Sequence, residues 1–218
     1  MLVRGKDEGA PDLGAAVRLF LASSNTGKLN EFRALAASTA HMVSLDLQPL
    51  PNFSGLPAFE ESAPTFGENA AGKALHYGRF SNLPVIADDS GLVVDALGGA
   101  PGVRSARYAG PAASWEERIE KLLAEIRACA SKDRRARFIG VIALAVRGRV
   151  VAVFSDAVEG ELLQSPRGAG GFGYDPVFFF SPAEKTFAQM SADEKNCYSH
   201  RAKAFRKLAD FLASSPVL

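Results

Sequence analysis

The feature that most constrains the fold is a short apolar run followed at once by two acids, Pro-Val-Ile-Ala-Asp-Asp-Ser-Gly at residues 84–91. The run predicts a buried strand and the Ser-Gly pair a turn, so we expect the strand to end on the acids where the sheet meets solvent. Side chains alternate between the faces of a strand, so Asp88 and Asp89 are expected to differ in role. One would hold a divalent cation or activate water while the other orients lysines. A plain polar turn is the alternative interpretation.

Strand and helix patterns alternate along the rest of the chain, which predicts an α/β fold with two lobes. Trp115 begins an amphipathic pattern and is expected in the core. Gly148 joins two apolar runs and predicts a β-hairpin. The expected strands are residues 17–22, 42–47, 85–87, 137–147, 150–158 and 177–180; the expected helices follow residue 28, begin at residue 65, span 115–126 and include 205–212; and the expected loops are 49–64, 98–110 and 160–173.

A small-residue loop, Ser23-Ser24-Asn25-Thr26-Gly27-Lys28, lies between the first strand and the first helix. Backbone N–H groups are free at a helix N-terminus, where the helix dipole favours anions, and Lys28 adds a positive charge. A phosphate is therefore a natural ligand, although the spacing is not that of a P-loop. The alternative is that Ser24 or Asn25 only caps the helix.

Polar loops elsewhere supply the groups that phosphoryl chemistry on a nucleotide requires. The cations are Lys28, Lys73, Lys195 and Arg201; the acids are Glu60, Glu61, Asp88 and Asp89; and the possible base readers are Phe172 and His200. We expect the cations to bind phosphates rather than balance surface acids, and Mg²⁺ to be held by carboxylate and phosphate oxygens. No serine-nucleophile or thiolate motif is present, which favours hydrolysis by metal-activated water. A nucleotide-binding regulator without turnover is the alternative.

Composition narrows the remaining classes. A formal net charge of +1 over 218 residues argues against nucleic acid as a partner. Cys129 and Cys197 have neither CxxC spacing nor a nearby histidine pair, which fits a cytoplasmic protein. No apolar run approaches the length of a membrane span. We interpret residues 1–16 as a loose leader and 17–218 as a single two-lobed domain.

Six blocks spread over nearly the whole chain resemble the inosine triphosphate pyrophosphatase family. They are Ser-Ser-Asn-Thr-Gly-Lys-Leu-Asn-Glu (23–31), Glu-Glu-(x)3-Thr-Phe-Gly-Glu-Asn-Ala-(x)2-Lys-Ala (60–74), Ala-Asp-Asp-Ser-Gly-Leu (87–92), Leu-Gly-Gly-Ala-Pro-Gly-Val-(x)-Ser-Ala-Arg-Tyr (97–108), Gly-Phe-Gly-Tyr-Asp-Pro-Val-Phe (171–178) and Ser-His-Arg (199–201). The resemblance implies a two-lobed α/β fold around a long curved mixed sheet flanked by helices, as a homodimer. It also implies Mg²⁺-dependent hydrolysis of ITP, dITP and XTP to the monophosphate and pyrophosphate.

The resemblance also implies site residues. Asp89 would be the catalytic acid/base and a metal contact, with Asp88 beside it, and the second metal ligand would be Glu60 or Glu61. The implied substrate contacts are Ser23, Ser24, Asn25, Thr26, Gly27, Lys28, Lys73, Ser90, Phe172, Gly173, Tyr174, Asp175, Lys195, His200 and Arg201. The first block departs from the family, which usually has Thr-Gly-Asn where this chain has Ser-Ser-Asn.

Overall fold

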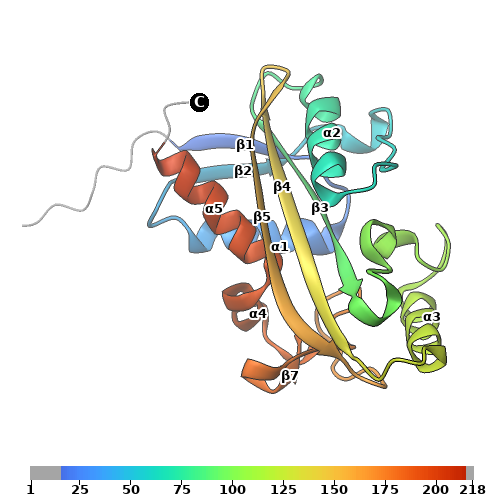
Figure 1. Ribbon diagram of the computed structural model, residues 1–218. Helices are drawn as coiled ribbons and strands as arrows, with labels where there is room; N and C mark the ends of the chain where they lie inside the picture. Colours follow the sequence, from blue (N-terminus) through green and yellow to red (C-terminus); the bar gives the residue numbers. More distant parts are fainter. Residues whose placement is uncertain (1–15, 215–218) are drawn as a thin grey trace, which may run out of the picture.

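Seven strands form one mixed sheet, in the order β2-β1-β3-β4-β5-β6-β7, in the computed structural model, which describes residues 16–214 (Figure 1). The strands are β1 Val17–Leu21, β2 Leu45–Pro49, β3 Val85–Val94, β4 Arg135–Val146, β5 Arg149–Leu162, β6 Phe178–Phe180 and β7 Lys185–Thr186. The helices are α1 Thr26–Ser38, α2 Phe66–Gly78, α3 Trp115–Ala128, α4 Ala192–Tyr198 and α5 His200–Ser214. Strand β1 is parallel to β2 and β3, and every pairing from β3 onward is antiparallel. The expected leader, except for its residue 16, and the last four residues of the chain lie outside the described part.

Strand β3 runs through the two acids instead of ending on them, which corrects the sequence-based prediction. It pairs with β4 along all ten of its residues, with Asp88 opposite Ile142 and Asp89 opposite Val141. The acids are therefore buried within a central strand, with 2% and 5% of their surface exposed. The long ladder to β4 outweighs the local turn preference of Ser-Gly, and the cations described below compensate the burial of charge on Asp88.

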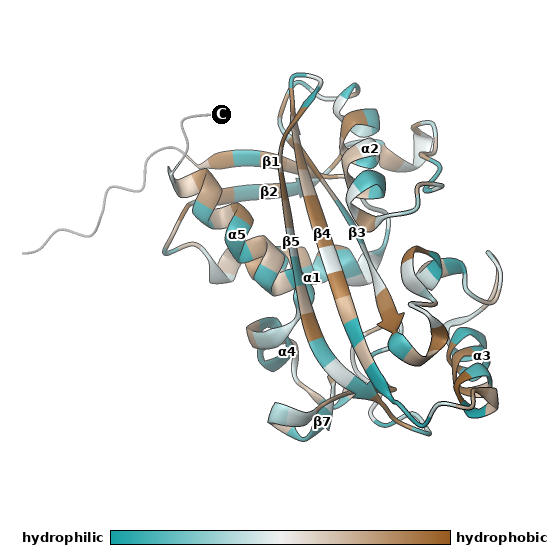
Figure 2. Cartoon of the chain, in the orientation of Figure 1, coloured by the Kyte–Doolittle hydropathy of each residue, from teal (hydrophilic) through white to brown (hydrophobic). Residues whose placement is uncertain are grey.

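Helices cover both faces of the sheet and divide the core into two lobes (Figure 1). In the first lobe α1 and α5 pack on one face, around Phe32, Ile86 and Phe205, and α2 packs on the other, around Ala70 and Ala87. In the second lobe α3 packs against the beginning of β4, the end of β5 and β6. Figure 2 shows hydrophobic colour over the middle of β4 and hydrophilic colour where the strand begins. The long strands β3, β4 and β5 connect the two lobes.

The predicted hairpin is confirmed, with β4 and β5 joined at Arg147 and Gly148, both of which have positive φ, as a tight type I′ turn requires.

Two predicted loops are shorter than expected. Gly160 belongs to β5, where an added Cβ would strike the Phe178 ring and the carbonyl of Phe179, and residues Gly102–Arg107 form a 3₁₀ helix. None of the helices between residues 16 and 214 is both long enough and apolar enough to span a bilayer.

Candidate active site

The alternation of β3 sends the two acids to opposite faces of the sheet. Ile86 contributes to the core under α1 and α5, whereas Ala87 contributes to the core under α2. Asp88 continues the first face and meets cations from α1 and α5, and Asp89 continues the second face, toward α2 and the acidic loop before it. The predicted difference in environment between the two acids is therefore present in the structure.

Asp88 is saturated with partners. Lys28 Nζ lies 2.5 Å from its Oδ2, Arg201 Nε lies 3.3 Å from its Oδ1, and the Ser90 hydroxyl donates to Oδ2 at 3.2 Å. Burial alone would raise the pKa of Asp88, but the charges of Lys28 and Arg201 outweigh it and hold that pKa far below its ordinary value. A carboxylate this firmly ionised and occupied is suited to orienting cations, not to taking a proton.

Asp89 has the opposite environment. Its Oδ1 accepts from the Ser90 backbone N–H at 3.0 Å, while its buried Oδ2 makes no hydrogen bond within 3.5 Å among residues 16–214; the Asn69 side chain is near enough to oppose the rise of its pKa, but it is the smallest of the effects on it. Burial and the nearby charge of Glu61 raise the pKa of Asp89 from 3.8 to about 6, against the opposing effect of Lys28. A carboxyl with one free oxygen and a pKa just below neutrality is suited to general acid–base chemistry.

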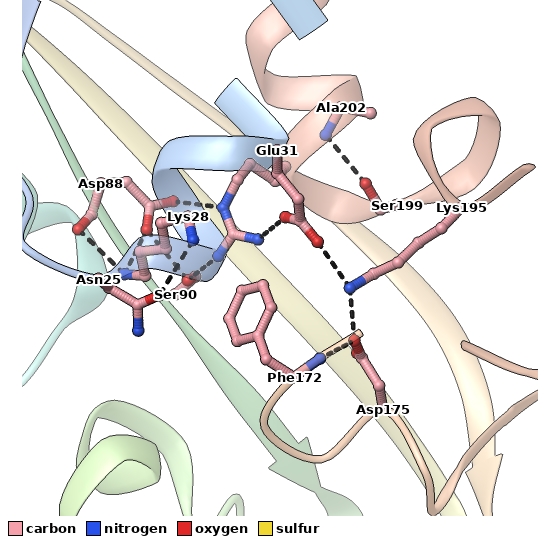
Figure 3. Close-up of polar contacts among 11 residues, drawn as sticks. Asn25, Lys28, Glu31, Asp88, Ser90, Phe172, Asp175, Lys195, Ser199 and Ala202 are labelled. Atoms are coloured by element: carbon pink, nitrogen blue, oxygen red, sulfur yellow. Dashed lines mark hydrogen bonds and ion pairs between the residues drawn. The ribbon is translucent and has the colours of Figure 1, made fainter. Parts of the chain in front are cut away.

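Glu31 on α1 ties together two of the predicted cations (Figure 3). Lys195 Nζ lies 2.7 Å from its Oε1, and Arg201 Nη1 donates to its Oε2. Burial would raise the pKa of Glu31, but the charges of Arg201 and Lys195 prevail and lower it from 4.5 to about 2. Lys195 also lies 2.5 Å from Asp175 Oδ2. The acids that Lys28, Lys195 and Arg201 contact lie inside the protein and not on its surface, because a buried cation needs a counter-charge. Phosphate binding by the cations stays a prediction.

Helix α2 holds the acidic loop in place. Lys73 Nζ lies 2.5 Å from Glu61 Oε1, and Arg107 donates to the Glu61 carbonyl at 2.5 Å. The Asn69 side chain accepts from the backbone N–H of Ala63 at 3.0 Å and donates to its carbonyl at 3.3 Å. Glu61 lines the same cleft as Asp89. Lys73 therefore orients an acid of the cleft.

The two metal-ligand candidates in the loop differ in position, since Glu60 is exposed and does not line the cleft. Within residues 16–214 no three acidic, histidine or cysteine side chains gather as a ready metal site. Mg²⁺ is usually bound by one or two carboxylates together with substrate phosphates and water, so it does not require such a cluster. Asp89, with its unpartnered oxygen, and Glu61 across the cleft fit that mode of binding.

Aromatic side chains line the same cleft. The Phe172 ring packs on Gly27, where an added Cβ would come within 2.7 Å of it, and lies 4.9 Å from Lys195 Nζ. His200 stacks on Phe138 with ring centroids 4.9 Å apart, and its buried Nδ1 has no partner in the described residues. Burial and the charge of Arg201 lower the pKa of His200 well below its ordinary value, so the ring is neutral and offers one donor and one acceptor.

Most of the predicted site residues meet in this cleft. Those lining it are Asn25, Lys28, Glu61, Asp89, Ser90, Phe172, Gly173, Tyr174, Asp175, Lys195, His200 and Arg201. Those that do not line it are Ser23, Ser24, Thr26, Gly27, Glu60, Lys73 and Asp88. Asn25 also caps α1, accepting from Lys28 N at 3.0 Å, so it has the capping role named in the alternative in addition to its place in the cleft. Tyr174 is buried at the wall of the cleft and donates its hydroxyl to the Ser105 carbonyl.

Three residues of the site were missed from the sequence. Glu31 lies three positions after Lys28 on the same helix, inside the first block, and that spacing was the available signal. Asn69 carried no signal beyond its place after the helix cap. Trp115 fitted a helical core pattern, yet it is half-buried and lines the cleft.

Fold and cleft together define a two-lobed α/β protein whose cleft is lined by acids, cations and aromatic side chains. The model of the Ham1 family matches residues 19–211, and the chain belongs to that family. This confirms the resemblance predicted from the six blocks and the predicted fold class.

Named relatives and solved structures agree with this membership. The chain is 46% identical over 190 residues to the dITP/XTP pyrophosphatase of Geobacillus kaustophilus, covering 87% of this chain and 91% of the relative. It is 41% identical over 192 residues to that of Bacillus subtilis, covering 88% and 95%. The HAM1 protein of Coxiella burnetii superposes with a TM-score of 0.82 at 40% identity, covering 91% of this chain and all of that one.

Proposed function

We propose that this protein is a nucleoside-triphosphate pyrophosphatase that hydrolyses ITP, dITP and XTP to the monophosphate and pyrophosphate, removing them from the nucleotide pool. The observation that carries the proposal is one cleft that brings together Asp89, whose raised pKa and unpaired Oδ2 suit it to accept a proton, the cations Lys28, Lys195 and Arg201, and the aromatic ring of Phe172. The curated relatives bear the name dITP/XTP pyrophosphatase, which supports the same activity. Nothing in them supports a regulator without turnover.

In this proposal Asp89 is the general base. Above pH 6 it is ionised, and its free Oδ2 accepts a proton from a water molecule as that water attacks the triphosphate. Its raised pKa makes it a stronger base than an ordinary aspartate. Asp88 is a positioning residue, because it fixes Lys28 and Arg201 and has no unpaired oxygen to offer.

The cations stabilise the negative charge of the phosphates. Lys28, Lys195 and Arg201 line the cleft and are held by buried acids, so their positions are set before the substrate binds. Such preorganised charges are worth more in a site shielded from water than on a surface. Substrate phosphates would share these cations with Asp88 and Glu31.

Base selection would come from hydrogen-bond donors beside the aromatic side chains. Inosine and xanthine carry a 6-oxo acceptor where adenine carries a 6-amino donor. The neutral His200 ring and the backbone N–H groups of Gly173 and Tyr174, three residues that line the cleft, would donate to an oxo group. Adenine would leave such a donor buried without a partner, which discriminates against ATP. Phe172 would supply the stacking face that every purine shares.

We further propose Mg²⁺ as the cofactor, held by Asp89 and Glu61 with the substrate phosphates, where it would neutralise phosphate charge and lower the pKa of bound water. We also propose that the protein is a cytoplasmic homodimer. It would act on free nucleotides and would bind neither nucleic acid nor membranes. The free thiols of Cys129 and Cys197 are compatible with a reducing compartment.

The test is a comparison of pyrophosphate release from ITP, dITP, XTP, GTP and ATP, with Mg²⁺ and with EDTA. We expect high kcat/KM for the first three substrates, low values for the last two, and loss of turnover in EDTA. A kcat/KM for ATP equal to that for ITP would refute the donor argument. Absence of turnover on every substrate would refute the enzyme assignment.

A further inference from the structure

Trp115 stands at the boundary between two hollows of the second lobe. It lines the nucleotide cleft together with Gly173 and Tyr174, and it also lines a groove between α3 and residues 166–173. The indole is therefore part of the wall that separates the cleft from the groove. In the core position expected from the sequence it would line neither.

Three contacts hold the indole in place. Its ring meets that of Tyr174 edge to face, with centroids 5.5 Å apart and an interplanar angle of 78°. The Arg118 guanidinium lies 4.7 Å from the ring centroid, one helical turn along α3. A Cβ added at Gly173 would lie 3.7 Å from the ring, so the indole covers the backbone of the loop that carries Phe172. The start of the helix is itself fixed by a capping box between Ser114 and Glu117.

We propose that Trp115 is a specificity-determining residue that contacts the purine base and shields the backbone donors of Gly173 and Tyr174 from water. This inference rests on the proposed function, which it deepens. A buried donor left unpaired by adenine is costly only while water cannot reach it. The indole closes the route by which water from the groove would reach that donor, and so it enlarges the penalty against ATP.

The inference predicts the kinetics of two variants. Trp115→Ala opens the wall, so KM for ITP rises roughly tenfold through lost contact with the base, and the preference for ITP over ATP falls about tenfold because water pairs the donors. The kcat for ITP stays near that of the parent, because Asp89 is untouched. Trp115→Phe keeps an aromatic wall and retains most of the preference. Glu120→Ala is the matched control, since Glu120 lines only the groove.

Trp115 is also the only tryptophan of the chain, so its fluorescence reports directly on the part of the cleft that we propose binds the base. The probes are IMP and pyrophosphate, added separately to the parent enzyme while calorimetry follows binding. We expect IMP to change the emission in step with its binding and pyrophosphate to leave it unchanged.

The two claims can fail separately. If the parent hydrolyses ITP while Trp115→Ala keeps the parental KM and ITP preference, the inference is overturned and the proposed function stands. The inference is also overturned if calorimetry shows that IMP binds while the fluorescence emission of Trp115 does not change. If the parent does not hydrolyse ITP but IMP binding shifts the emission, the proposed function fails and contact between Trp115 and the base is upheld.

Discussion

Asp88→Asn and Asp89→Asn make the same change at neighbouring positions, yet we expect them to alter the free energy of unfolding in opposite directions. Each replaces a carboxylate by an amide of nearly the same shape, so packing is little affected. Asp88 is surrounded by Lys28, Arg201 and Ser90, whereas Asp89 faces Glu61 with one oxygen unpaired. Asp89→Asn should therefore stabilise the protein and Asp88→Asn should destabilise it.

The pKa of Asp89 sets the size of the increase in the free energy of unfolding that we expect for Asp89→Asn. Its rise from 3.8 to about 6 is about two pKa units, or roughly 3 kcal/mol at 1.36 kcal/mol per unit. A raised pKa means that the folded state binds the proton more tightly than the unfolded state, so stability is greatest below pH 3.8 and falls as pH rises through about 6. The advantage of Asp89→Asn should be small near pH 3.8 and complete above pH 6.

The free energy of unfolding depends on the ionisation of Asp88 in the opposite way. Its lowered pKa contributes stability that is present above 3.8 and is lost as pH falls through its folded-state value. Removing one partner of a buried ion pair costs about 3–5 kcal/mol, which is the expected loss for Asp88→Asn at neutral pH.

The assay is urea denaturation of the parent and both variants in EDTA, at neutral pH and near pH 4. Added Mg²⁺ serves as a control, because a cation beside ionised Asp89 should shrink the advantage of Asp89→Asn. A destabilised Asp89→Asn at neutral pH, or the same sign for both variants, would refute the division of roles between the two acids.

Three further predictions concern other parts of the cleft. Glu31→Gln should lower the free energy of unfolding at neutral pH by about 3 kcal/mol, because the pKa of Glu31 falls from 4.5 to about 2 on folding. In urea titrations the difference from the parent should disappear as the pH is lowered from 4.5 to about 2, and an unchanged midpoint at neutral pH would contradict this prediction. Phe172→Ala should raise KM for ITP, dITP and XTP alike by roughly tenfold, since stacking does not distinguish purines, and a loss confined to one substrate would count against stacking. His200→Ala should narrow the kcat/KM gap between ITP and ATP by removing a donor to the 6-oxo group, and a preserved gap would assign selection to other groups.

The sequence predicted the separation of the two acids because alternation along a strand is a local property. It did not predict that β3 would continue past them. The ladder to β4, which decides the length of the strand, is made with residues about fifty positions away. Burial of Asp88 is tolerated only because α1 and α5 bring Lys28 and Arg201 to it, and that arrangement is tertiary.

The same reason explains the residues that were missed. Glu31 shows a helical spacing from Lys28, but its partners Lys195 and Arg201 lie far along the chain. Trp115 has the spacing of a core residue and packs partly as one. Its place at the cleft depends on the distant loop around Gly173, which lies beside its ring. Periodicity indicates that a residue faces inward, and it does not distinguish a core from the wall of a cleft.

Phosphorus NMR of ITP turnover in Mg²⁺, with the parent and Asp89→Asn side by side, tests both the bond that is cleaved and the role of Asp89 as the general base. The parent should convert ITP into IMP and pyrophosphate in equal amounts, without IDP. The folded Asp89→Asn should lose about 10²–10⁴-fold in rate, the usual contribution of a general base. Formation of IDP and inorganic phosphate by the parent, or an Asp89→Asn rate close to the parental one, would contradict the proposed reaction and the role of Asp89.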